Sequence, residues 1–133
     1  MKPENVLVDE KGYMVITDFG LAKILEQEET TDTFCGTPEY MAPEIQNDVG
    51  GYGFECDWWS LGILCYEMIV GFAPFYAKKN QHPDEVFKII REKRIVFPDA
   101  KKHGIPMTEE CKDFIRKLLA KKPEDRLGSK NDI

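Results

Sequence analysis

The first apolar segments of the chain predict a short β-hairpin. Residues 6–8 are apolar and residues 13–17 are rich in β-branched and aromatic types, which favour extended strands. The intervening Asp-Glu-Lys-Gly sequence supplies turn-forming residues. Because an isolated hairpin is only marginally stable in water, we expect this one to pack on another part of the protein.

Further along the chain, the apolar positions predict helices. Residues 55–70 are apolar on almost every face, which indicates a helix buried at the centre of the protein. Residues 83–93 have an amphipathic pattern, and Thr108 can cap a later helix with a similar pattern. The positions expected to face the core are Val86, Phe87, Ile89 and Ile90 in the first amphipathic helix, and Cys111, Phe114, Ile115, Leu118 and Leu119 in the second. Pro123 ends this pattern, so residues 124–133 are predicted to form a polar tail.

Between the hairpin and the first helix, residues 18–44 show little periodicity. Gly and Pro alternate there with clusters of polar residues, which predicts a long loop. Long loops without structure of their own are uncommon in compact domains and are usually functional or disordered.

Charge and composition exclude several classes of protein. The net charge of -6 argues against a nucleic-acid-binding surface and fits a basic partner better. The most apolar stretch, residues 61–75, is interrupted by Gly, Glu and Pro and is too short for a membrane span, and the first residues show no targeting signal. The 4 cysteines lack metal-ligand spacing, which indicates reduced thiols. We therefore expect a soluble, cytoplasmic protein.

Two oxygen-bearing side chains flank the predicted hairpin. Asn5 precedes its first strand, and Asp18 follows its second strand and begins an Asp-Phe-Gly sequence. Both positions lie at the same end of the hairpin, so the pair could present oxygen ligands to Mg²⁺. Alternatively, Asp18 caps a turn and Asn5 simply begins a strand, and the pair alone favours that simpler interpretation.

A set of short motifs favours the Mg²⁺-site interpretation of Asn5 and Asp18, because the motifs occur together and in order. They are K-P-E-N at residues 2–5, D-F-G at 18–20, T-F-C-G-T-P-E-Y-M-A-P-E at 33–44, D-W-W-S-L-G at 57–62 and R-L-G at 126–128. The set resembles the signatures of the large lobe of serine/threonine protein kinases, over essentially the whole chain. The double Trp resembles the AGC group most, with the calmodulin-dependent group as the nearest rival.

The resemblance implies a mainly α fold with a short β-hairpin, equivalent to a protein-kinase large lobe truncated at both ends. Residues 1–133 would form a partial kinase domain, with the end of the catalytic loop, an activation segment at residues 18–44 and a helical subdomain at residues 45–133. The implied activity is transfer of the γ-phosphate of ATP to Ser or Thr of proteins.

Roles in catalysis follow from the resemblance by position. Asp18 and Asn5 match the two Mg²⁺ ligands, and Lys2 matches the lysine that neutralises charge on the transferred phosphoryl group. These three residues would thus bind Mg²⁺ and ATP, although Lys2 alone could be a solvated terminal lysine. Thr37 matches the residue that helps to select a Ser or Thr acceptor.

The resemblance also implies regulation in the activation segment. Thr33 matches the threonine that an upstream activating kinase phosphorylates, and Lys23 matches a basic residue that binds the phosphate. Thr30 and Thr31 lie nearby and could be phosphorylated instead.

Substrate-binding residues are implied in the same way. Phe34, Pro38 and Met41 match a pocket for an apolar residue after the acceptor, or they could simply pack the loop on the core. Glu4 and Glu67 match acidic residues that bind an Arg two residues before the acceptor, so protein substrates with Ser or Thr near Arg are expected. Because a carboxylate in an apolar helix is costly unless paired, Glu67 could instead have a fixed intramolecular partner.

Other residues match structural positions of the family. Glu44 and Arg126 match a buried ion pair that ties the activation segment to the helical core. Asp57 matches a residue that braces the backbone of the catalytic loop.

The chain holds no H-R-D motif, no Gly-rich loop and no V-A-I-K lysine. We therefore expect the 133 residues alone to be inactive as a kinase. The alternative is a non-catalytic, kinase-like module that binds basic peptides or a partner protein through its acidic groove and the helix at residues 83–93.

Overall fold

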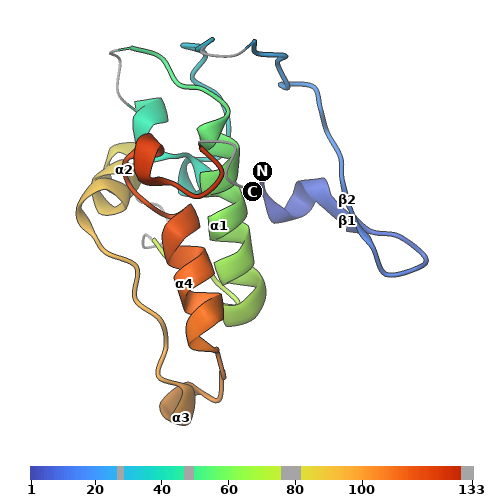
Figure 1. The fold of residues 1–133 in the computed structure, drawn as a ribbon, viewed down its shortest axis with the longest axis vertical. Helices are drawn as coiled ribbons and strands as arrows, with labels where there is room; N and C mark the ends of the chain where they lie inside the picture. Colours follow the sequence, from blue (N-terminus) through green and yellow to red (C-terminus); the bar gives the residue numbers. More distant parts are fainter. Residues whose placement is uncertain (27–28, 47–49, 76–81, 130–133) are drawn as a thin grey trace.

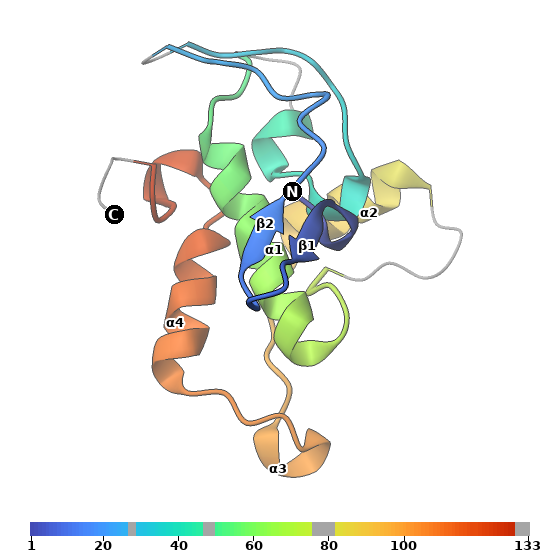
Figure 2. The same ribbon diagram turned by 90° about the vertical axis from the view of Figure 1, so that its right-hand side faces the viewer.

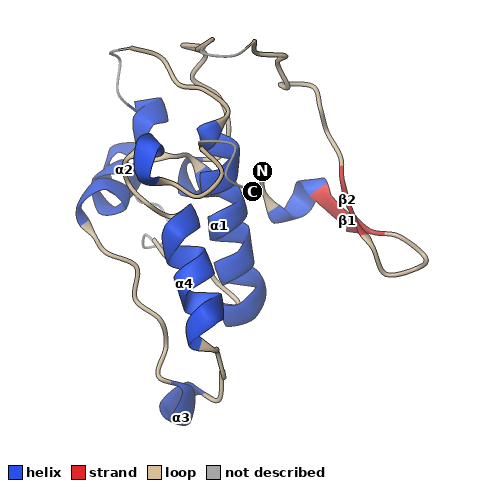
Figure 3. Cartoon of the chain, in the orientation of Figure 1, coloured by secondary structure: helices blue, strands red, loops and turns tan. Residues whose placement is uncertain are grey.

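The computed structural model describes residues 1–26, 29–46, 50–75 and 82–129. Within these residues, a hairpin precedes a set of α-helices (Figures 1 and 3). The strands are β1 (Val6–Val8) and β2 (Met14–Ile16), and the helices are α1 (Glu55–Val70), α2 (Pro83–Glu92), α3 (Ala100–His103) and α4 (Glu109–Leu118). Short 3₁₀ helices occur at Pro3–Asn5, Pro38–Tyr40, Pro43–Gln46 and Pro123–Asp125. The expected fold class, mainly α with a short hairpin, is confirmed.

The hairpin forms where the sequence predicts it. Its strands are antiparallel, with Val6 opposite Ile16, and the carboxylate of Asp9 accepts hydrogen bonds from the backbone N–H groups of Lys11 and Tyr13, both at 2.8 Å. Gly12 has φ 89°, a left-handed conformation that glycine adopts without strain. The hairpin extends to one side of the helical body in Figure 1, and the residues of β2 are all exposed. Strand β2 therefore does not pack on another part of the described protein as expected, whereas Val6 of β1 is half-buried.

Helices α1 and α4 form the centre of the helical body and lie side by side in both ribbon views (Figures 1 and 2). Gly62 allows them to approach closely, because a Cβ at this position would lie 2.8 Å from Leu119 Cδ2 and 2.9 Å from Leu118 Cβ. Gly71 ends α1 in a left-handed conformation, and its N–H donates to the carbonyl of Glu67 at 2.7 Å. The Oγ1 atom of Thr108 accepts from the N–H of Cys111 at 3.2 Å and caps α4, as predicted.

The core is assembled from several elements that are distant in sequence. Trp59 and Ile63 of α1, Ile90 of α2 and Ile115 of α4 are fully buried. The rings of Trp59 and Phe75 are stacked, with centroids 5.6 Å apart and an interplanar angle of 8°. This shared core positions the end of the loop before α1, because Ala42 belongs to it and Met41 is also buried.

Some expectations about the helices were wrong. Phe114 is 44% exposed, whereas Ile115, Leu118 and Leu119 are buried, so the core-facing stripe of α4 is narrower than its sequence pattern. Residues Met68 and Ile69 are also exposed, whereas Tyr66 and Val70 in the same part of α1 are buried, so this end of the helix is buried on one face only. The four-residue helix α3 and the 3₁₀ helices were not predicted, since such short elements carry too few residues for a periodic pattern.

The predicted polar tail was also wrong for residues 126–129, whereas Glu124 and Asp125 are exposed. Arg126 is 1% exposed, and Gly128 packs so closely on Trp58 that a Cβ there would lie 2.6 Å from Trp58 Cε2. The reason is that a buried partner for Arg126 comes from a distant part of the chain. Residues 130–133 of that tail and residues 27–28 of the predicted loop lie outside the described residues.

Candidate active site

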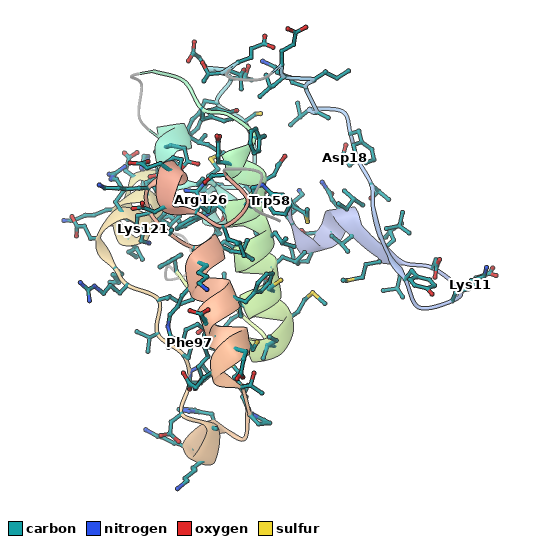
Figure 4. All side chains as sticks on the ribbon, in the orientation of Figure 1. Lys11, Asp18, Trp58, Phe97, Lys121 and Arg126 are labelled. Carbon is teal, nitrogen blue, oxygen red and sulfur yellow. The ribbon has the colours of Figure 1, made fainter. Side chains whose placement is uncertain are left out.

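The hairpin brings Asn5 and Asp18 together at its open end. The N–H of Thr17 donates to the carbonyl of Asn5 at 2.8 Å, which extends the strand pairing by one step. The side-chain amide of Asn5 then donates to Asp18 Oδ2 at 3.4 Å. Asp18 itself has φ 61°, a left-handed conformation that is uncommon for a residue with a side chain. Figure 4 shows Asp18 on the segment that leaves the hairpin.

Asn5 and Asp18 could supply part of a Mg²⁺ ligand set. Asp18 Oδ1 and the amide oxygen of Asn5 are both oxygen ligands, the type that Mg²⁺ prefers, and Mg²⁺ commonly retains waters and binds phosphate oxygens as well. Within the described residues, no group of three or more His, Cys, Asp or Glu side chains could hold a metal ion by itself. A metal here would therefore complete its coordination with waters or with oxygens of a bound phosphate group. Lys2 lies in the same turn, where its carbonyl accepts from the N–H of Asn5 at 3.0 Å.

The loop at residues 18–44 carries a cluster of hydroxyl groups around one ammonium group. Lys23 Nζ lies 2.6 Å from Thr31 Oγ1 and 2.6 Å from Thr33 Oγ1, and it donates to both. The backbone of Thr31 pairs with that of Tyr52 through two hydrogen bonds of 2.9 and 3.0 Å. The hydroxyl of Tyr52 donates to the carbonyl of Thr33 at 2.5 Å. Tyr52 was not predicted as a site residue, and the Gly-Gly-Tyr-Gly sequence around it indicates only a loop.

The predicted acidic substrate site contains an additional tyrosine. Tyr40 OH donates to Glu67 Oε2 at 2.6 Å, so this half-buried carboxylate has an intramolecular partner and retains Oε1 for another. Burial raises the pKa of Tyr40 well above its usual value, and the carboxylates of Glu67 and Glu4 add to that effect. Glu4 and Glu67 thus both act on one phenol, although Glu4 is exposed and Glu67 only partly so.

The residues expected to line the apolar substrate pocket have different environments. Met41 is 4% exposed, and its Cε would lie 3.4 Å from a Cβ on Gly36, so it packs the loop on the core. Phe34 is 60% exposed and meets the ring of Phe87 edge to face, with centroids 5.9 Å apart. Pro38 begins a 3₁₀ helix, and the carbonyl of the half-buried Thr37 accepts from the N–H of Tyr40 at 3.0 Å. Core packing and an accessible apolar surface therefore both occur in this segment.

Two residues expected to have structural roles lie in contact. Arg126 Nη1 lies 2.6 Å from Glu44 Oε1, and the Arg126 side chain is fully buried. Figure 4 shows Arg126 beside Trp58, at the end of α1 that lies near the activation segment. Asp57 lies in the first turn of α1, and its side chain is exposed.

The family model described as the protein kinase domain matches residues 1–132. This chain belongs to the protein kinase family. It is 47% identical over 134 residues to the serine/threonine-protein kinase sgk-1 of Caenorhabditis elegans, with 100% of this chain and 27% of the relative covered. It is 43% identical over 133 residues to the RAC serine/threonine-protein kinase of Drosophila melanogaster, with 99% and 20% covered.

A third relative agrees with these two. The serine/threonine-protein kinase sck2 of Schizosaccharomyces pombe is 42% identical over 134 residues, with 100% of this chain and 20% of the relative covered. The chain thus spans between 20% and 27% of the length of these kinases. Its resemblance to the AGC group of serine/threonine kinases is confirmed. Among the described residues of this kinase chain, no helix has the length and apolar character needed to cross a membrane.

Lys121 is a further residue of the kinase chain whose environment the sequence does not predict. Its ammonium lies 3.8 Å from the ring centre of Phe75 and 5.0 Å from that of Trp59, and it donates to the carbonyl of Ile90. Burial, together with the nearby Arg126 guanidinium, lowers the pKa of Lys121 to about 8. In the sequence it stands in a Lys-Lys pair before Pro123, which is typical of a solvated surface.

Proposed function

We propose that this chain supplies metal ligands and the substrate-binding surface of a kinase that transfers the γ-phosphate of ATP to Ser or Thr of proteins. The observation that carries the proposal is the approach of Asn5 and Asp18 at the end of the hairpin, 3.4 Å between the amide nitrogen and a carboxylate oxygen. Phosphoryl transfer depends on positioning and on neutralising charge more than on covalent chemistry by the protein. Two oxygen ligands held by a hairpin suit that task.

Each predicted site residue has a task in this proposal. Asn5 and Asp18 hold Mg²⁺, which when bound neutralises charge on the phosphates of ATP. Lys2, in the same turn, contacts the transferred phosphoryl group, and Thr37 favours a hydroxyl-bearing acceptor. Asp18 has a left-handed conformation, and its carboxylate accepts from the amide of Asn5, so the two side chains are held together before any metal arrives.

The proposed substrates carry Arg two residues before the acceptor. Glu67 Oε1 is free of the hydrogen bond that Tyr40 makes to Oε2, and Glu4 lies near enough to the same phenol to influence it. A guanidinium group can bind two carboxylates with directional, charge-assisted hydrogen bonds. The exposed face of Phe34 suits an apolar residue after the acceptor.

Regulation and location complete the proposal. An upstream activating kinase phosphorylates Thr33, and Lys23 then binds the phosphate. All 4 cysteines are free thiols, as expected in the reducing environment of the cytoplasm, where the proposed reaction takes place.

Metal binding provides the direct test. Mn²⁺ can replace Mg²⁺ and broadens the NMR signals of nearby nuclei. In the presence of ADP, we expect Mn²⁺ to broaden the side-chain amide signal of Asn5 first, and we expect Asp18→Asn to abolish this effect. Asp9→Asn is the matched control, since Asp9 is an exposed carboxylate at the other end of the hairpin. Equal broadening in the Asp18→Asn variant would contradict the proposal.

A second test concerns catalysis. The 133 residues contain no H-R-D motif and no Gly-rich loop, so we expect no phosphorylation of an Arg-containing peptide by this chain with Mg²⁺ and ATP. The same peptide should still bind, and Glu67→Gln should weaken binding several-fold while Glu85→Gln, an exposed position on α2, leaves it unchanged. Peptide binding that ignores Glu67 would overturn the assignment of the Arg site.

A further inference from the structure

Lys23 is shared by two threonines. Its Nζ lies 2.6 Å from Oγ1 of both Thr31 and Thr33, and the two hydroxyl oxygens lie 3.3 Å apart. Among the described residues, no carboxylate lies within 4.0 Å of this ammonium. Within the described part of the chain, the side chains that accept hydrogen bonds from Lys23 are therefore two neutral hydroxyl groups, each of which can accept a phosphoryl group.

We propose that Thr31 is a second phosphorylation site of the activation segment, and that its phosphate and a phosphate on Thr33 are alternatives for the single cation of Lys23. The inference deepens the proposed function, because it rests on the role given there to Thr33 and Lys23. Thr31 was only one of two possible alternatives in the sequence, and what is new is its selection over Thr30 and the competition of the two phosphates for one cation.

The geometry makes the two positions equivalent for Lys23. A phosphate adds about −1.5 to −2 charges and three acceptor oxygens to the hydroxyl that carries it. Because the ammonium already contacts both hydroxyl oxygens at the same distance, either phosphate can form a charge-assisted hydrogen bond with a small rotation of its side chain.

The same geometry disfavours two phosphates at once. Two dianionic groups attached to oxygens 3.3 Å apart repel each other strongly, and one ammonium can neutralise only part of their charge. Asp32 lies between the two threonines in sequence and adds a further negative charge. Singly phosphorylated forms should therefore bind Lys23, whereas in a doubly phosphorylated form one phosphate must turn away.

The two sites differ in access. Thr33 is exposed, whereas Thr31 is half-buried and its backbone pairs with Tyr52 through hydrogen bonds of 2.9 and 3.0 Å. A phosphorylating kinase must draw Thr31 out of this pairing. The hydroxyl oxygen of Thr31 then forms a bond to the γ-phosphorus of ATP, and the bond from this phosphorus to the β–γ bridging oxygen breaks. ADP leaves, and the hydroxyl proton passes to the base of the phosphorylating kinase. Phosphorylation of Thr31 should thus be slower than that of Thr33.

The test places phosphothreonine at position 31, at position 33 or at both in the 133-residue chain by semisynthesis. A ³¹P NMR titration then gives the second pKa of each phosphate. We expect Lys23→Met to raise this pKa in both singly modified chains, because the nearby ammonium favours the dianion. In the doubly modified chain, Lys23→Met should raise the pKa of one phosphate much more than that of the other.

Lys11→Met is the matched control, since Lys11 is an exposed lysine of the hairpin turn and should leave every phosphate pKa unchanged. Lys23→Arg keeps the positive charge and should preserve the effect. If Lys23→Met changes the pKa of the phosphate at position 33 but not at position 31, the shared-cation inference is wrong while the proposed role of Thr33 survives. If neither phosphate responds, the proposed role of Lys23 fails as well.

Occurrence of the modification is tested separately. The Thr33→Val variant is incubated with ATP and a kinase that phosphorylates Thr33 of the parent chain, and the phosphorylated position is located by mass spectrometry. We expect phosphate on Thr31, and we expect Thr31→Val in the same background to remove it. Phosphate found on Thr30 alone would overturn the assignment of Thr31. The assignment would also be overturned if the Thr33→Val variant incorporates no phosphate while the chain without this substitution is phosphorylated on Thr33.

Discussion

Arg126 donates two parallel hydrogen bonds to the carboxylate of Glu44, a residue 82 positions earlier in the sequence. Nη1 lies 2.6 Å from Oε1 and Nη2 lies 2.9 Å from Oε2. The guanidinium also donates to the carbonyls of Glu55 and Ala120, at 2.8 and 3.2 Å. One buried side chain thus connects the end of the activation segment, the start of α1 and the segment after α4.

Removal of one partner of this pair should be strongly destabilising. Glu44→Gln leaves the buried guanidinium without a counter-charge, and we expect a loss of roughly 3–5 kcal/mol in the free energy of unfolding. Urea denaturation measures this loss. Asp113→Asn is the matched control, because Asp113 pairs with Lys117 at 2.7 Å on an exposed surface and should contribute less than about 1 kcal/mol. Similar losses in the two variants would show that Glu44 and Arg126 do not act as a buried pair.

Alanine substitutions at Gly128 and Gly71 distinguish the effect of backbone strain on stability from that of steric overlap. Both have left-handed φ values, 88° and 91°, but a Cβ on Gly128 would lie 2.6 Å from Trp58 whereas a Cβ on Gly71 would meet nothing within 4 Å. Gly71→Ala should lower the free energy of unfolding by about 1–2 kcal/mol through strain alone. Gly128→Ala should add an overpacking cost of about 1–3 kcal/mol. Thermal or urea unfolding that ranks the two variants equally would contradict the close contact with Trp58.

The hairpin and α1 could be predicted from the sequence because their signals are local. Strand-forming residues flank a turn, and residues 55–70 form an unbroken apolar run that ends at a glycine. The proximity of Asn5 and Asp18 also followed from hairpin geometry, which places the ends of paired strands together. The roles assigned to Lys23 and Thr33 depended on the family resemblance, because nothing local indicates that residues 10 positions apart in a loop should meet.

Features that depend on contacts between distant elements could not be predicted. Phe114 satisfies the apolar periodicity of α4, but the width of the buried stripe is set by α1, so Phe114 remains exposed. Lys121 stands in polar sequence, yet its ammonium lies 5.0 Å from the ring centre of Trp59. The family resemblance implied a buried pair of Arg126 with Glu44, but not that the guanidinium carbon lies 5.3 Å from the same ring. Charge in the sequence indicates a solvated surface unless a distant partner is known.

The environment of Lys121 should give the protein an unusual pH dependence. Because its pKa falls to about 8 in the folded state, the unfolded state binds more protons between pH 8 and about 10.5. The free energy of unfolding should therefore gain a rising contribution as the pH increases through this window, and Lys121→Met should remove that contribution. Burial raises the pKa of the Cys56 thiol to about 12, which opposes the rise above pH 9. The comparison is therefore made in a Cys56→Ala background by urea denaturation. The two chains compared are the Cys56→Ala variant and the same variant with Lys121→Met. A difference in their free energies of unfolding that does not change with pH would contradict the burial of this ammonium.

The hydrogen bond between Tyr40 and Glu67 can be measured through the ionisation of the phenol. Burial is the largest cause of the raised pKa of Tyr40, followed by the hydrogen bond and charge of Glu67, while Glu39 contributes least. Glu67→Gln should therefore let Tyr40 ionise at a distinctly lower pH, whereas Glu39→Gln should have a much smaller effect. Phenolate absorbance during a pH titration, with Tyr40→Phe used to assign the transition, measures the effects of both substitutions.

The raised pKa of Tyr40 also affects stability. Because the folded-state pKa is raised, the contribution of Tyr40 to the free energy of unfolding is lost as the pH rises above the unfolded value near 10. The Glu67→Gln chain should therefore lose less stability than the parent chain in alkaline solution. Equal shifts for the two glutamates would mean that Tyr40 senses only the general negative charge of this surface, and Glu67 Oε2 would then be as available to a substrate Arg as Oε1.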